Sequence, residues 1–221
     1  MENASVMQKP AVRIPSYTLG EELFNAISHG IGAVLSIAAL GLMTVWAHGA
    51  IRITSVSLFG SALIILYTIS CIYHALSPRL KGKRVLRIID HCNVFLLVLC
   101  TYIPVSLIGV GGALGWVLFG TVCFFAILGI VLTAVNLERF QVPAVFCHLV
   151  SGWSILIGVP GLLRNMGGKG LFFLILGGVL YSAGAVLYRI GAKKKYGHCV
   201  FHIFCLASSF FHFWCVFRYL L

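Results

Sequence analysis

The chain has 221 residues, of which 60% are apolar and only 10% are charged, and its formal net charge is +11. Its mean hydropathy is +1.03, a value that a water-soluble domain of this length does not sustain. This composition excludes a soluble globular protein and predicts an integral membrane protein.

Seven apolar stretches of roughly 20 residues follow one another, each long enough to cross a hydrocarbon core of about 30 Å as a helix. The expected spans cover residues 24–47, 54–76, 85–107, 114–135, 143–163, 171–190 and 198–219. Residues 1–20 contain charges and prolines and are expected to form a polar cytoplasmic tail. The sequence therefore predicts an all-α integral membrane protein, with residues 21–221 forming one seven-transmembrane helix bundle.

Basic residues are distributed unequally between the two sides of these spans. The tail and the second, fourth and sixth loops hold twelve of the sixteen Lys and Arg, and the other side holds Arg52, Arg164, Lys169 and Arg218. This imbalance predicts a cytoplasmic N-terminus and a C-terminus outside, opposite to G-protein-coupled receptors. The basic loops then face the anionic inner leaflet, which attracts each residue by about 1 kcal/mol, so no nucleic acid is needed to explain the charge.

Two histidines open the last apolar stretch. His198 and His202 are four residues apart, so on an α-helix their side chains share one face and can bind one metal ion. Zinc requires a further ligand, and His74, at a matching depth in the second span, is the best candidate. His212 lies roughly 15 Å beyond His202 along the helix, too far to share the ion. We therefore predict a metal site of His74, His198 and His202.

Further polar residues are expected in the same layer. Asp90 begins the third span, where its carboxylate could accept a proton from a metal-bound water or orient a ligand histidine. Ser70 lies one turn from His74 on the same face, where its hydroxyl could bond a ligand or a water. A third group shares one face of the first helix and comprises Glu22, Asn25 and His29.

Simpler interpretations are open for several of these residues. The histidines could form interhelical hydrogen bonds with carbonyl groups or with Asp90, which are worth about 0.6 to 2 kcal/mol in membranes. Glu22 and Asn25 could cap the first helix. The eight cysteines are expected to be small buried hydrophobes, and Cys92 or Cys199 is only a minor candidate for an additional ligand.

Four segments occur in the order EELFNAISHGIG, SCIYHALSP, LRIIDHCNVFLLVLCTYIP and GHCVFHIFCLASSFFHF. Together they resemble the hemolysin III branch of the progestin and adipoQ receptor family, bacterial type, over nearly the whole chain. The resemblance implies that zinc is the metal, with His74, His198 and His202 as its ligands. It also implies that Asp90 lies near the metal water and that Ser70 is the serine of an SxxxH motif.

The resemblance extends to alkaline ceramidases, which build a related zinc site and hydrolyse lipid amides. It implies a protein of the cell membrane that acts in membrane lipid homeostasis, with a long-chain lipid as its substrate or ligand. In the hydrolytic mechanism Asp90 would pass the proton to the leaving amine. An apolar bundle interior can hold an acyl chain, because each buried methylene contributes about 0.8 kcal/mol.

Two other functions fit the same sequence. In a receptor or regulator of membrane lipid state, the metal would hold helix ends together and no bond would be cleaved. A pore is suggested by the hemolytic name of the family, but the spans contain neither a ring of charges nor an amphipathic stripe. A retinal protein is excluded, because every lysine lies in the tail or in a loop.

Overall fold

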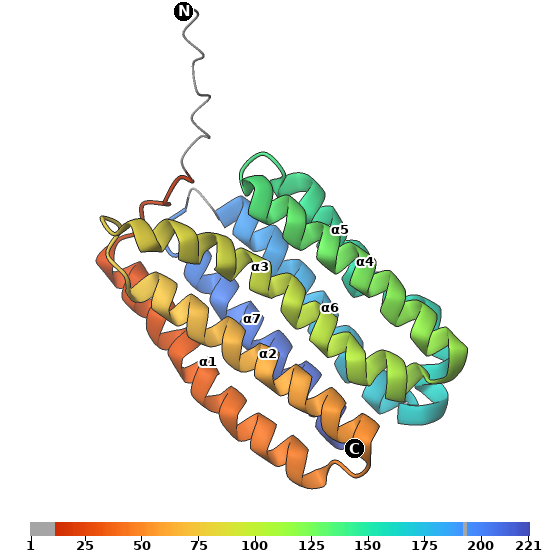
Figure 1. Cartoon of the computed structure of the whole chain (residues 1–221). Coiled ribbons are helices and arrows are strands. Elements are labelled where there is room, and N and C mark those ends of the chain that lie inside the picture. Colours follow the sequence, from red (N-terminus) through yellow and green to blue (C-terminus); the bar gives the residue numbers. More distant parts are fainter. Residues whose placement is uncertain (1–11, 192–193) are drawn as a thin grey trace, which may run out of the picture.

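The computed structural model describes residues 12–191 and 194–221, and these form helices and connecting turns without a strand. The helices are α1 (Leu19–Trp46), α2 (Ala50–Ala75), α3 (Lys81–Pro104), α4 (Gly112–Asn136), α5 (Gln141–Trp153), α6 (Val159–Gly191) and α7 (Gly197–Tyr219). A π-helix, Val105–Val110, extends α3, and a 3-10 helix, Ser154–Gly158, joins α5 to α6. The predicted all-α fold is confirmed (Figure 1).

The helical segment from Gln141 to Arg189 makes two passes through the bundle. Its backbone leaves helical geometry at Gly167, whose φ of 69° lies in the left-handed region that favours glycine. The two halves then run side by side, since the Trp153 indole donates to Ser182 Oγ at 3.1 Å and Arg189 donates to Gln141 Oε1 at 2.8 Å. Six continuous helical stretches in the described chain are long and apolar enough to span a membrane, and the reversal at Gly167 gives the seven predicted passes.

The helices are packed in a ring that follows chain order. Each helix from α1 to α4 packs against the next one along the chain, and α7 packs against both α6 and α1. The helix α5 touches α3 and α6 only sparsely. Because the passes alternate in direction, the described N-terminal residues and the C-terminus lie at opposite ends of the bundle (Figure 1). The end of α2 and the start of α7 therefore meet at the N-terminal end. The orientation of the bundle in the membrane stays a prediction.

The first helix begins earlier than the sequence predicts, at Leu19, because a capping box precedes it. Thr18 Oγ1 accepts from the backbone N–H of Glu21, and the Glu21 carboxylate accepts from the backbone N–H of Thr18 at 2.8 Å. The side chains of Glu22 and Asn25 therefore do not form the cap, although Glu22 lies in the first turn, where an acidic group complements the helix dipole. Asn25 is fully buried and Glu22 is half-buried, so the bundle interior is where both act.

Large apolar side chains cover the outside of the bundle, as a lipid environment requires. Examples from different helices are Leu35, Trp116, Phe146 and Phe172, all exposed. Inside, small residues let helices approach closely: a Cβ added to Gly129 would lie 2.2 Å from Cε1 of Phe95. All eight cysteines are free thiols and are buried or half-buried, as the sequence predicts.

Candidate metal centre and cavity

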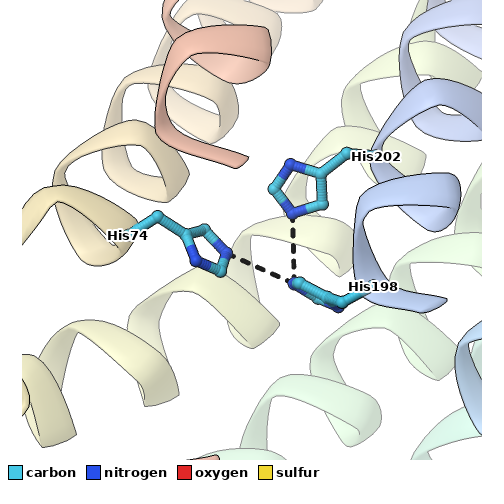
Figure 2. A group of neighbouring side chains, drawn as sticks. All are labelled: His74, His198 and His202. Carbon is cyan, nitrogen blue, oxygen red and sulfur yellow. Dashed lines mark hydrogen bonds between the residues drawn. The ribbon is translucent and has the colours of Figure 1, made fainter. Parts of the chain in front are cut away.

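Three histidine rings converge between α2 and α7, at the N-terminal end of the bundle (Figure 2). Nε2 of His198 lies 3.2 Å from Nε2 of His74 and 3.1 Å from Nε2 of His202. One ligand nitrogen from each ring lies within 4.8 Å of the other two. Metal–nitrogen bonds of about 2.0–2.1 Å in a tetrahedral site place ligand nitrogens roughly 3.3–3.4 Å apart. The buried triad could therefore hold one metal ion.

The count of ring hydrogens also favours a cation at the centre. Nδ1 of His74 faces the Glu22 carboxylate at 2.6 Å, so in the neutral ring this nitrogen carries the hydrogen and Nε2 carries a lone pair. Nδ1 of His202 faces Ser28 Oγ, which donates its own hydrogen to a backbone carbonyl, so Nδ1 of His202 donates too. His198 can then donate from Nε2 to only one of the two lone pairs. A metal ion would satisfy all three nitrogens.

A buried ion pair supports His74. Glu22 Oε2 accepts from His74, while Oε1 accepts from Lys83 Nζ at 2.5 Å. Lys83 also donates to the carbonyl of Leu76, at the end of α2, at 2.8 Å, and its side chain is fully buried. A carboxylate in this position fixes the tautomer and orientation of a ligand histidine. The lysine in turn fixes the carboxylate, and together they join α1, α2 and α3 beside the metal centre.

This role of Lys83 is not evident from the sequence. Lys83 belongs to the basic run assigned to the second loop, but its side chain is completely buried and lies over the ring of Tyr73, 5.1 Å from the ring centroid. A lysine in a run of loop charges carries no local signal that distinguishes burial from exposure. The signal is the tertiary contact with Glu22, which the sequence does not show.

Three other predicted residues lie near the triad. Nδ1 of His29 lies 2.8 Å from Ser70 Oγ, and the His29 ring stacks on the ring of His202 with 3.6 Å between centroids. His29 and Ser70 therefore support a candidate ligand and do not belong to the ligand set. Asn25, one turn before His29, has no hydrogen-bond partner for its side chain among the described residues.

A predominantly apolar cavity of about 230 Å³ extends from the triad into the bundle. His198 and His202 line one end, together with Ser70 and the half-buried Asp90. Asp90 lies beside Ser70 and Arg87. Apolar side chains form the rest of the cavity wall. They come from α2, from α3 and the π-helix that extends it, from the 3-10 helix between α5 and α6, and from α6, and they include Leu66, Val98, Val105, Ile155 and Leu174. The cavity thus joins a polar end with candidate metal ligands to an apolar interior.

His212 and the two cysteines considered as minor candidates lie outside the triad. His212 places Nε2 3.3 Å from the carbonyl of Leu174, as a structural role requires, and it also lines the cavity. The thiol of Cys92 lies near a carbonyl of α4, and that of Cys199 lies near the carbonyl of Glu21. Neither cysteine belongs to the metal-ligating group in the described chain.

Comparison with known proteins gives a match over most of the described bundle. A family model described as "Haemolysin-III related" matches residues 17–213, a range that contains every residue of the triad and the cavity end. Hemolysin-3 of Bacillus cereus is 36% identical over 204 residues, covering 91% of this chain and 92% of that protein. The hemolysin-3 homolog of Bacillus subtilis is 38% identical over 206 residues, covering 92% and 96%. The human monocyte to macrophage differentiation factor is 21% identical over 210 residues, covering 92% and 86%.

Proposed function

Because this chain belongs to the haemolysin-III-related family of multi-pass cell-membrane proteins, we propose that it binds zinc and hydrolyses a lipid amide in membrane lipid homeostasis. One observation carries this proposal. Two members of the triad, His198 and His202, line the same apolar cavity as Asp90. A metal centre, an acid–base group and a site for an acyl chain thus occur together.

The donor set fits zinc. Three imidazole nitrogens form the ligand set of catalytic zinc sites that keep a fourth position open, whereas structural zinc sites use four protein ligands. His74, His198 and His202 would hold the ion, with His74 oriented by Glu22. When bound, zinc would polarise an acyl carbonyl and make a water nucleophilic at neutral pH.

Asp90 is the acid–base group in this proposal. Asp90 lines the same cavity as His198 and His202, from where its carboxylate would take a proton from the attacking water and give it to the leaving amine. Ser70 connects Asp90 to the support of the triad, because its hydroxyl lies beside Asp90 and bonds to His29. His29 stacks on His202, so the acid–base group and one ligand share a common support.

The substrate class follows from the walls of the cavity. The polar part of the lipid would lie at Asp90 and the triad, and the acyl chain would extend between Val98, Val105 and Leu174. Each buried methylene contributes about 0.8 kcal/mol, so a long chain binds without many polar contacts. We therefore expect amides of long-chain fatty acids to be better substrates than short-chain amides.

The metal content of the purified protein is the first test, measured by plasma mass spectrometry. We expect about one zinc per chain in the wild type and in Asp90→Asn, and none in His198→Ala/His202→Ala. Fatty-acid release from a panel of lipid amides should then fall by about 10²- to 10⁴-fold in Asp90→Asn. A wild type without stoichiometric metal would refute the zinc centre, and full activity in Asp90→Asn would refute the role of Asp90.

A regulator of membrane lipid state is the second candidate, and the positions of the supporting residues favour it. The triad joins α2 to α7, and the contacts of Glu22 and Lys83 add α1 and α3, so the metal would hold four helix ends together. In this role the metal controls packing and no bond is cleaved. Asp90→Asn would then leave the biological effect on membrane lipids unchanged, while loss of the ligands would abolish it.

A further inference from the structure

His198 differs from the other two candidate ligands in how its ring is held. His74 and His202 each direct Nδ1 at a side-chain oxygen, that of Glu22 and that of Ser28. Nδ1 of His198 is buried and has no hydrogen-bond partner within the described residues. Ligand histidines are usually oriented through this second nitrogen. The orientation of His198 must therefore depend on another contact.

Aromatic rings provide this contact. The ring of Tyr17 stacks on that of His198, with 5.1 Å between centroids and 15° between planes. Tyr188 of α6 meets the imidazole edge-on at 5.4 Å, and Phe201 of α7 is tilted against it at 5.6 Å. Tyr17 precedes α1, so one of the three rings belongs to a segment outside the helices.

The segment that carries Tyr17 is also held by contacts with residues that are distant from it in the sequence. The backbone N–H of Arg13 donates to Glu138 Oε1 at 2.7 Å, in the turn between α4 and α5. The guanidinium of Arg87 donates to the carbonyl of Arg13 and, at 3.3 Å, to the same carboxylate oxygen. Between this anchor and the capped start of α1, Pro15 and Tyr17 line the cavity. The segment thus crosses the N-terminal end of the cavity and is fixed on both sides.

We propose that residues 13–18 form a strap that closes the N-terminal end of the cavity, and that Tyr17 is a positioning residue for His198. The inference rests on the metal centre of the proposed function. With the strap in place, Tyr17 covers one face of His198 and separates the triad from water. Release of the Glu138 anchor would free Tyr17 and open the polar end of the cavity, while an acyl chain stayed in its apolar part. Water would enter and a polar product would leave by this route.

The rate of metal release tests the strap without any enzymatic assay. Zinc-loaded full-length protein is mixed with excess chelator, and transfer of the metal is followed over time. Tyr17→Ala removes the stacked ring and should release zinc at least 10-fold faster than the wild type, whereas Tyr17→Phe keeps the ring and should match the wild type. Glu138→Gln weakens the anchor on the exposed surface and should also speed release. The double variant Tyr17→Ala/Glu138→Gln should release zinc no faster than Tyr17→Ala alone, because both changes act through the same strap.

The outcomes separate this inference from the function on which it rests. If loaded wild type and a folded Tyr17→Ala variant release zinc at the same rate, the positioning role of Tyr17 is overturned. If Tyr17→Phe is as fast as Tyr17→Ala, stacking is not the cause. If Glu138→Gln is unchanged, the anchor does not hold the strap, and this surface variant keeps the test valid even where Tyr17→Ala fails to fold. A wild type that takes up no zinc refutes the proposed function itself.

Discussion

The ion pair between Glu22 and Lys83 has two separable effects, one on metal affinity and one on stability. Glu22→Gln keeps the size of the side chain but replaces the carboxylate that accepts from His74 Nδ1 at 2.6 Å and from Lys83 at 2.5 Å. The loss of a partner that orients a ligand histidine costs about 10- to 100-fold in metal affinity, or roughly 1.4 to 2.7 kcal/mol. We expect a shift of this size in a competitive titration with a chromophoric chelator.

The stability effect has a different origin. Lys83 is fully buried, so Glu22→Gln leaves its ammonium without a counter-charge, and breaking a buried pair in this way costs about 3 to 5 kcal/mol. Adding Lys83→Met removes the unpaired charge and should restore most of the stability in a denaturation titration. Metal affinity should stay low in the double variant, because His74 still lacks its carboxylate. Arg79→Met, in the turn before α3 and exposed, is the matched control and should change neither quantity.

Two results would contradict this reasoning. Wild-type metal affinity in Glu22→Gln would mean that the carboxylate does not orient His74 for metal binding. No recovery of stability on adding Lys83→Met would mean that the unpaired charge is not the source of the loss. Because the two quantities respond differently in the double variant, neither result can be attributed to general unfolding.

Two further predictions concern packing and orientation. Gly129→Ala should lower stability by about 1 to 3 kcal/mol, because the added Cβ would lie 2.2 Å from Cε1 of Phe95; Gly120→Ala, where no atom lies within 4 Å, should have little effect on the melting temperature. The charge imbalance predicts that the C-terminus lies outside and the loop between α2 and α3 in the cytoplasm. Alkaline phosphatase fused to the C-terminus should therefore be active, and a fusion in that loop should be inactive. The reverse pattern would refute this orientation and the contact of the basic loops with the inner leaflet.

The number of passes and the triad could be predicted from the sequence, because both depend on regular helix geometry. The length of the apolar stretches predicts the spans. The chain reverses at Gly167, which lies between the predicted spans 143–163 and 171–190. The i, i+4 spacing places His198 and His202 on one face, and helix rise brings His74 to the same depth. Thr18 and Glu21 also carry a recognisable signal, the T-x-x-E pattern of a capping box, which the sequence analysis does not use.

The supporting residues could not be predicted in the same way. Lys83 and Tyr17 owe their roles to contacts between segments that helix periodicity does not relate, namely α3 with α1 and the strap with α7. The strap has no periodic pattern, so its path over the cavity depends on the Glu138 and Arg87 contacts, which only the folded bundle brings together. Regular geometry thus predicts the candidate ligands, and irregular tertiary contacts determine how they are held.

If the triad binds metal, the ion must also contribute to the stability of the whole bundle, since its candidate ligands come from α2 and α7 and their support from α1 and α3. A ligand that binds only the folded state stabilises it by about 4.1 kcal/mol at 1,000 times its dissociation constant. Chelation should therefore lower the melting temperature of the wild type and of Asp90→Asn equally, and that of His198→Ala/His202→Ala not at all. Equal stability of the wild type with and without metal would show that the ion does not hold the helix ends together. Both the regulator function and the hydrolase proposal would then lose their basis, because each requires an ion bound to the triad of the folded bundle.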